Sequence, residues 1–247
     1  MRGPGGAFVL VAVQLLAGTF AAMWFVSVRH RVINRGYFRS TTWVLWPLLA
    51  AASGLLPKDL KPLGFGVAGL WLVYLVCVYS HRPLLEWVAG AAGALAGIGL
   101  TGAIGQRLCE EGCVLGIVHS MAGLLFMGAV THGMTLGHWY LNQARLPIGP
   151  LSGATKLLFA AIAISFALGI ATRSQLVSGV VAGGILPVSG SAYWLTWLLL
   201  NVATGGLALM IHATVKQRST QSATGLLYIA IVTALGAQFL LNLLAAT

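Results

Sequence analysis

Apolar stretches long enough to cross a lipid bilayer recur along the whole chain. A helix needs about 20 residues to span a hydrocarbon layer of roughly 30 Å. We place eight spans, at about residues 5–28, 41–56, 63–80, 84–104, 113–141, 154–172, 191–215 and 222–246. Because 58% of the 247 residues are hydrophobic and only 7% are charged, a water-soluble globule is excluded. The sequence therefore predicts an all-α polytopic membrane protein, a bundle of about eight transmembrane helices that forms one domain over residues 1–247.

The basic residues lie between the spans and predict the orientation of the bundle. The net charge of +10 would suggest nucleic acid in a soluble protein, but we expect no such partner here, because these charges mark the two sides of a membrane. With the loop after the first span in the cytoplasm, nine basic residues are cytoplasmic: Arg29, Arg31, Arg35, Arg39, Arg82, Arg145, Lys156, Lys216 and Arg218. Five are exterior: Arg2, Lys58, Lys61, Arg107 and Arg173. We expect a multi-pass protein of a prokaryotic cytoplasmic (inner) membrane with both termini exterior.

The six histidines are distributed unevenly across this predicted topology. His119 falls in the outer half, and the other five fall in the cytoplasmic half: His30, His81, His132, His138 and His212. His30 and His81 are flanked by arginine at span ends, where histidine is tolerated as an interfacial residue. His132 lies about ten residues, or roughly 15 Å, from the end of its span. An ionisable side chain at this depth predicts a functional site.

The polar groups that the spans lack narrow the chemistry further. Apart from Glu86 near one span end, no Asp or Glu lies inside a predicted span, which argues against carboxylate-based proton or sodium transport. The chain shows no serine nucleophile with acid and histidine partners and no phosphate-binding glycine loop. A neutral imidazole among apolar helices instead indicates a ligand of haem iron, of another metal or of chlorophyll magnesium, or a hydrogen-bond partner of quinone.

One or two b-type haems fit these residues best. Two histidines on different helices can bind one iron while the macrocycle occupies apolar space. His138 and His212 lie at similar predicted depth, so we expect them to be the metal ligands of one haem. His132 lies deeper and points about 240° away from His138 around an ideal helix. It would bind a second cofactor or hydrogen-bond a quinone headgroup.

A second pair of histidines and three arginines complete the predicted cofactor site. His30 and His81 are level with each other, so a second haem between them is an alternative. Arginine side chains at helix ends can pair with haem propionates. Arg29, Arg31 and Arg82 are placed for this role.

These residues predict a membrane-embedded b-type haem-binding electron-transfer subunit. It would exchange electrons between quinone and a partner subunit, since the chain has almost no mass outside the membrane, and would serve as the membrane subunit of an oxidoreductase. One alternative is a haem or copper transport or assembly protein, in which the histidines with Met127 and Met134 form a relay. The other is a structural subunit of a larger complex, in which the histidines satisfy hydrogen bonds at helix ends.

Two further patterns leave their meaning open. The glycines Gly128, Gly133 and Gly137 reduce bulk either for a flat cofactor or for close helix packing. Cys109 and Cys113 fall at an exterior span end, where they form either a disulfide or two unpaired thiols.

Overall fold

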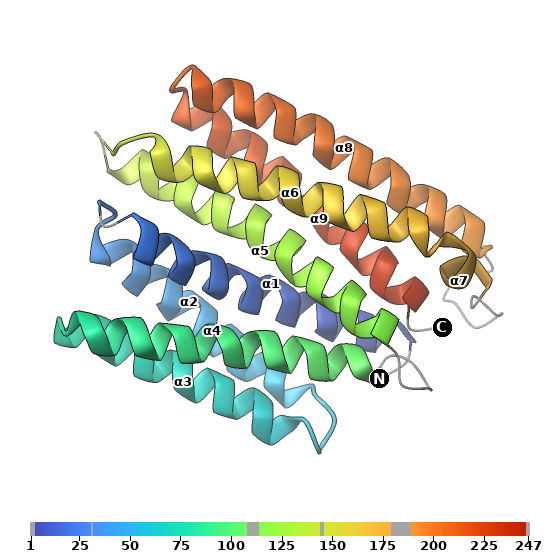
Figure 1. The fold of residues 1–247 in the computed structure, drawn as a ribbon, viewed down its shortest axis with the longest axis horizontal. Coiled ribbons are helices and arrows are strands. Elements are labelled where there is room, and N and C mark those ends of the chain that lie inside the picture. Colours follow the sequence, from blue (N-terminus) through green and yellow to red (C-terminus); the bar gives the residue numbers. More distant parts are fainter. Residues whose placement is uncertain (1–2, 31, 108–113, 144–145, 179–188, 246–247) are drawn as a thin grey trace.

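The computed structural model describes residues 3–30, 32–107, 114–143, 146–178 and 189–245. These residues form helices joined by short connections, and none of them lies in a β-strand. The helices are α1 (Gly3–Arg29), α2 (Arg35–Gly54), α3 (Lys61–Ser80), α4 (Pro83–Gln106), α5 (Val114–Asn142), α6 (Gly149–Ala171), α7 (Arg173–Ser178), α8 (Gly190–Lys216) and α9 (Thr220–Ala245). All except α7 run along the length of the bundle (Figure 1).

The predicted all-α polytopic membrane bundle is confirmed. Seven of the described helices are long and apolar enough to cross a membrane: α1, α3, α4, α5, α6, α8 and α9. The predicted span at 41–56 corresponds to α2, which begins earlier, at Arg35, because the Asn34 side chain accepts a hydrogen bond from the Gly36 amide as an N-cap. The helix has 20 residues and contains Arg35, Arg39 and Pro47, so it is less apolar than the other seven.

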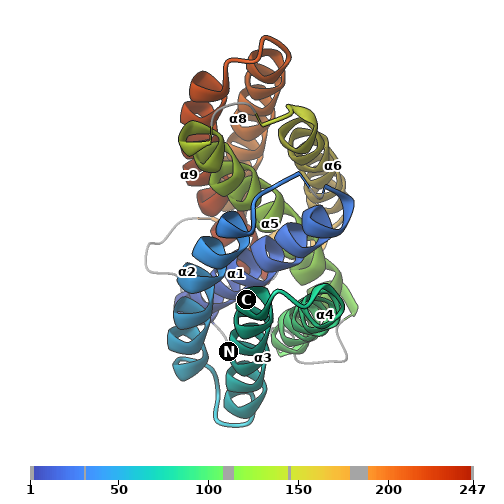
Figure 2. The same cartoon turned by 90° about the vertical axis from the view of Figure 1, so that its left-hand side faces the viewer.

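The eight long helices form two four-helix groups with the same internal order. In the first group α1 and α3 each pack on α2 and α4, and in the second group α5 and α8 each pack on α6 and α9. The groups meet through α1 and α5, flanked by the contacts of α1 with α9 and of α4 with α5. Seen along the helices, a half-turn about the centre exchanges α1 with α5, α2 with α6, α3 with α8 and α4 with α9 (Figure 2).

Two local features agree with this internal two-fold arrangement. Among the described residues other than glycine, only His81 (φ 57°) and Arg218 (φ 58°) have positive φ. They lie in the equivalent α3–α4 and α8–α9 turns, at the end of the bundle where α1, α3, α5 and α8 finish, which we call the His81 end. The helices α1 and α5 cross at Gly18 and Gly128, where a Cβ on Gly128 would lie 2.6 Å from the Gly18 Cα. Glycine at both positions lets the two backbones touch.

The interior of the first group is filled by aromatic rings. Phe20 stacks on Trp71 with ring centroids 4.4 Å apart, and Tyr74 meets Phe20 edge to face. Gly93 lies against both Phe20 and Trp71, and Gly97 lies against Ala17. Gly93 and Gly97 of α4 therefore serve helix packing.

Candidate functional site

His132 is the most deeply buried of the histidines, with no exposed surface. It lies on α5 ten residues before that helix ends at Asn142. Its Nδ1 is 3.0 Å from the Tyr37 hydroxyl of α2, and that hydroxyl is 3.1 Å from the Thr135 hydroxyl. Thr135 in turn donates to the His132 carbonyl oxygen at 3.0 Å. The three side chains form a hydrogen-bonded set between α2 and α5, and the Tyr37 hydroxyl has a further side-chain hydrogen bond with Thr41 of α2.

The number of hydroxyl protons in this set indicates which ring nitrogen of His132 carries a proton. The Thr135 hydroxyl proton is used on the His132 carbonyl, so the Thr135 oxygen must accept from Tyr37. The Tyr37 proton is then used on Thr135, so the Tyr37 oxygen must accept from His132 Nδ1–H. This is the arrangement that satisfies all three contacts, and in a neutral imidazole it leaves Nε2 with a free lone pair. No described residue forms a hydrogen bond with this buried atom.

His132 has aromatic side chains on one side, and one helical turn away its helix α5 touches α1. The Tyr37 ring meets the imidazole edge to face at 6.2 Å between centroids, and Trp139 is 6.0 Å from Tyr37. One turn away, the contact between Gly18 and Gly128 brings the α1 and α5 backbones together, so a macrocycle has no room between them there. His132 is therefore enclosed by packed side chains and backbone.

The glycines of α5 contact neighbouring helices. Gly128 faces Gly18 of α1, as described above, and Gly133 and Gly137 face α9. A Cβ on Gly133 would lie 3.1 Å from Leu227, and one on Gly137 would lie 2.7 Å from the Thr224 hydroxyl. Of the two interpretations that the sequence left open, these contacts favour close helix packing.

The other two proposed haem ligands have different neighbours. His138 is exposed, and its Nδ1 is 3.2 Å from the Tyr228 hydroxyl of α9. His212 of α8 is partly buried against Phe159 of α6, with ring centroids 5.8 Å apart, and its Nδ1 has no partner among the described residues. These contacts do not bring His138 and His212 together on one iron.

His30 and His81 are also separated by their neighbours. His30 follows α1 and lies beside Gly153 of α6. His81 follows α3 and lies between two arginines of α2, with its Nδ1 2.6 Å from Arg35 Nη1 and its Nε2 3.3 Å from Arg39 Nη2. Both histidines directly follow helices that finish at the same end of the bundle, but their contacts are with different helices.

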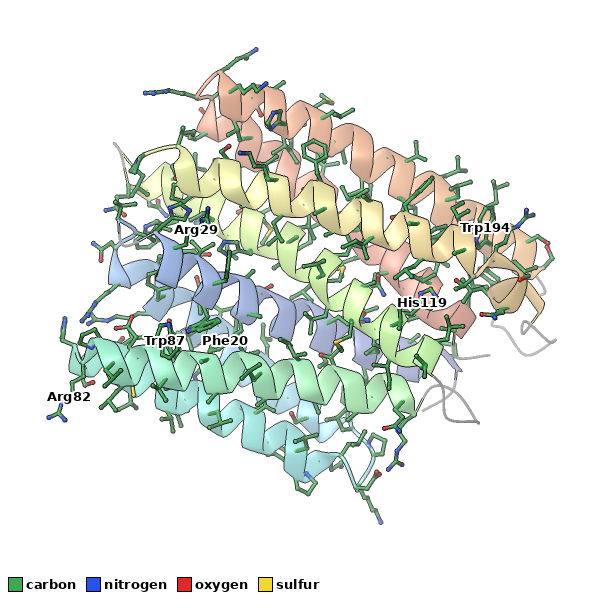
Figure 3. All side chains as sticks on the ribbon, in the orientation of Figure 1. Phe20, Arg29, Arg82, Trp87, His119 and Trp194 are labelled. Atoms are coloured by element: carbon green, nitrogen blue, oxygen red, sulfur yellow. The ribbon has the colours of Figure 1, made fainter. Side chains whose placement is uncertain are left out.

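The arginines and cysteines of the prediction are placed as follows. Arg29 and Arg82 are both exposed, and Arg82 extends away from the bundle beyond the start of α4 (Figure 3). Arg31, Cys109 and Cys113 lie outside the described residues. Cys77 is a free, partly buried thiol.

A second buried polar group, which the histidine pattern did not indicate, lies between α1, α5 and α9. Gln14 Nε2 donates to the Ser120 carbonyl at 3.2 Å, and Asn242 Nδ2 donates to Gln14 Oε1 at 2.9 Å. Gln238 Nε2 donates to Asn242 Oδ1 at 2.9 Å. All four residues are at most 1% exposed. This chain of amides links the two helix groups, and the signal for it was the presence of three amide side chains inside apolar spans.

Within the parts of the chain that the structure covers, no three His, Cys, Asp or Glu side chains gather closely enough to hold a metal ion. His119, the remaining histidine, contacts the Thr172 hydroxyl through Nε2 at 3.0 Å. The candidate site is therefore His132, a buried imidazole with a free Nε2 that is supported by Tyr37 and Thr135. His119 is also buried, and its Nδ1 likewise has no partner among the described residues. No protein-family model, curated protein or solved structure matches this chain.

Proposed function

We propose that the protein is an electron-transfer subunit of the prokaryotic cytoplasmic membrane in which His132 Nε2 binds the iron of a b-type haem. The free lone pair on Nε2, buried where water cannot satisfy it, is the observation that carries this proposal. Histidine ligands of metals characteristically have the other ring nitrogen held by a hydrogen bond, as Tyr37 holds Nδ1 here. A haem at this position would supply one-electron chemistry.

The rest of the chain has a supporting role in this proposal. His132 is fully enclosed, so this proposal requires the side chains around Nε2 to rearrange and the macrocycle to lie away from the contact between Gly18 and Gly128. Nearly all described residues belong to helices, so a docked partner subunit would supply the second redox site, and quinone would exchange electrons from the bilayer. Helix α1 begins and helix α9 ends at the end of the bundle opposite His81, and from the distribution of basic residues we expect that end to be exterior.

The visible spectrum of the detergent-purified protein, oxidised and reduced with dithionite, tests the proposal. We expect haem absorption that persists through purification and disappears in His132→Gly, because that variant removes the ligand. Added imidazole should restore the spectrum in His132→Gly by occupying the space of the lost side chain. His119→Gly is the matched control on the same helix, and it should keep its haem.

Two results would contradict the haem assignment. A colourless protein recovered at full yield from haem-supplemented cells excludes it, and metal analysis then separates copper handling from a structural role. A spectrum that survives in His132→Gly but is lost in His138→Ala and His212→Ala would return the iron to those two histidines.

Tyr37→Phe should weaken haem retention about tenfold to a hundredfold while leaving the fold intact, the usual effect of removing a hydrogen bond to a ligand histidine. The variant leaves Nδ1–H without an acceptor, so the imidazole loses its fixed orientation and proton position. Haem dissociation to an excess of apomyoglobin measures the change. Tyr228→Phe, which removes the hydroxyl beside exposed His138, is the control and should have wild-type retention.

A further inference from the structure

A group of charged residues lies at the His81 end of the first helix group, where α2 begins, α3 ends and α4 begins. It consists of Arg35, Arg39, His81 and Glu86, which we call the basic cluster. Glu86 is the single carboxylate among these four residues, and its contact with Arg35 is 3.5 Å long. Two guanidinium groups and an imidazole are therefore accompanied by one carboxylate.

The basic cluster has more hydrogen-bond donors than acceptors. Both ring nitrogens of His81 face a guanidinium, at 2.6 Å for Arg35 and 3.3 Å for Arg39. A neutral imidazole has one acceptor nitrogen, so one of these arginines faces an N–H group instead. The Arg39 Nε is buried and has no partner among the described residues. An anion accepting from both arginines would relieve this excess of donors and of positive charge.

The basic cluster adjoins exposed aromatic and aliphatic side chains on α2 and α3. Arg39 lies over the Tyr79 ring at 4.3 Å, and the indole N–H of Trp43 donates to the Tyr79 hydroxyl at 3.1 Å. Trp43 is 51% exposed, Tyr79 is 49% exposed, and Val76, one turn further along α3, is 60% exposed. In a membrane-spanning bundle, such an outward apolar surface contacts acyl chains, and tryptophan and tyrosine lie at headgroup level.

We propose that the basic cluster binds the phosphate headgroup of an anionic phospholipid, with the acyl chains along the α2–α3 surface beside Trp43 and Val76. Basic pockets between transmembrane helices are suited to such headgroups. A lipid fits better than a free anion because the cationic groups lie next to the exposed apolar surface of α2 and α3. The site is independent of the proposed haem.

The internal two-fold arrangement supplies a matched comparison. The place equivalent to the basic cluster, at the start of α6 and in the α8–α9 turn, has Lys156 and Arg218, both exposed, in place of the paired arginines. Arg35→Gln/Arg39→Gln and Lys156→Gln/Arg218→Gln therefore remove the same charge from the same end of the bundle. The two double variants differ in that only the first removes residues of the proposed lipid site.

Binding is measured by native mass spectrometry and by thermal unfolding in neutral detergent, with phosphatidylglycerol, phosphatidylcholine or inorganic phosphate added. We expect phosphatidylglycerol to bind and raise the Tm, and phosphatidylcholine and inorganic phosphate at equal concentration to have little effect. Arg35→Gln/Arg39→Gln should weaken phosphatidylglycerol binding roughly twenty-five-fold, about fivefold for each arginine. Lys156→Gln/Arg218→Gln should change it less than twofold.

Glu86→Gln tests the proposal without removing a cation, should the double arginine variant not fold. Loss of this carboxylate frees Arg35 and should tighten phosphatidylglycerol binding several-fold. Three outcomes would overturn the proposal. These are equal weakening in both double variants, an equal Tm rise with inorganic phosphate, and weaker binding in Glu86→Gln.

Discussion

Gly128→Ala is expected to lower the free energy of unfolding by about 3 kcal/mol or more, which is the upper part of the range for overpacking. The added methyl would lie 2.6 Å from the Gly18 Cα and closer still to the Gly18 carbonyl carbon, and neither backbone atom can move aside as a flexible side chain would. The helices α1 and α5 would have to separate along the contact that joins the two helix groups. Gly18→Ala should be equally damaging, since its methyl would meet the Leu124 carbonyl and the Gly128 backbone.

Unfolding in mixed micelles with increasing dodecyl sulfate, followed by tryptophan fluorescence, measures this effect. Gly99→Ala on α4 is the matched control, because nothing lies within 4 Å of its added methyl. Alanine has the higher helix propensity, so this control should be as stable as the wild type or slightly more stable. If Gly128→Ala and Gly99→Ala have the same free energy of unfolding, the α1–α5 crossing can accommodate the added methyl and this prediction is wrong.

The position of His132 along its helix could be predicted from the sequence, but the direction of its side chain could not. His132 lies ten residues before the end of α5, as expected, because helix ends follow from the loss of apolar residues. The direction of a side chain depends instead on the rotation of its helix, which tight contacts determine. The approach of Gly137 to Thr224 of α9 is one of these contacts, and His138 beside it faces Tyr228. A similar depth to that of His212 is therefore not enough to establish a shared ligand, and that pairing stays a prediction.

The partner of His132 was beyond sequence reasoning for a related reason. Tyr37 is 95 residues away in the chain, and it lies just before the predicted second span, in a stretch interrupted by arginines. The apolar pattern placed the start of that span at about residue 41, whereas the Asn34 cap starts the helix at Arg35 and so brings Tyr37 into the bundle. Burial of Tyr37 depends on the packing of α2 within the first group, a contact between distant segments.

The equivalence of the two helix groups could not be predicted from the sequence, because equivalent positions have different residue types. The α3–α4 turn has His81 at its left-handed residue and the α8–α9 turn has Arg218. The first group has Phe20 stacked on Trp71 in its interior. The second group has Trp197 stacked on Phe166, together with the buried polar residues Ser165, Asn201 and Thr204. Helix order and direction are shared, so the relationship is visible only when the helices are seen in space (Figure 2).

Gln14→Leu is expected to destabilise the bundle by about 2–3 kcal/mol, because it removes both an acceptor and a donor from the amide chain that links the two helix groups. Asn242 Nδ2 would lose its acceptor and the Ser120 carbonyl would lose the Gln14 donor, in surroundings where water cannot replace them. Hydrogen bonds inside membrane bundles contribute roughly 0.6 kcal/mol on average, so most of this effect comes from the buried groups left unpaired.

The double variant Gln14→Leu/Asn242→Leu tests that explanation by unfolding in the same mixed micelles. Removing both Gln14 and Asn242 eliminates the groups that each single variant leaves unpaired at their shared bond, while Gln238 Nε2 loses its acceptor in the single Asn242 variant and in the double variant alike. The double variant should therefore cost about 1 kcal/mol less than the sum of the two single variants. Gln221→Leu, on an exposed part of α9, is the control and should unfold with the wild type. Strict additivity of the two single effects would show that Gln14 and Asn242 do not act through one hydrogen-bonded chain, and that α1 and α9 are held together by packing alone.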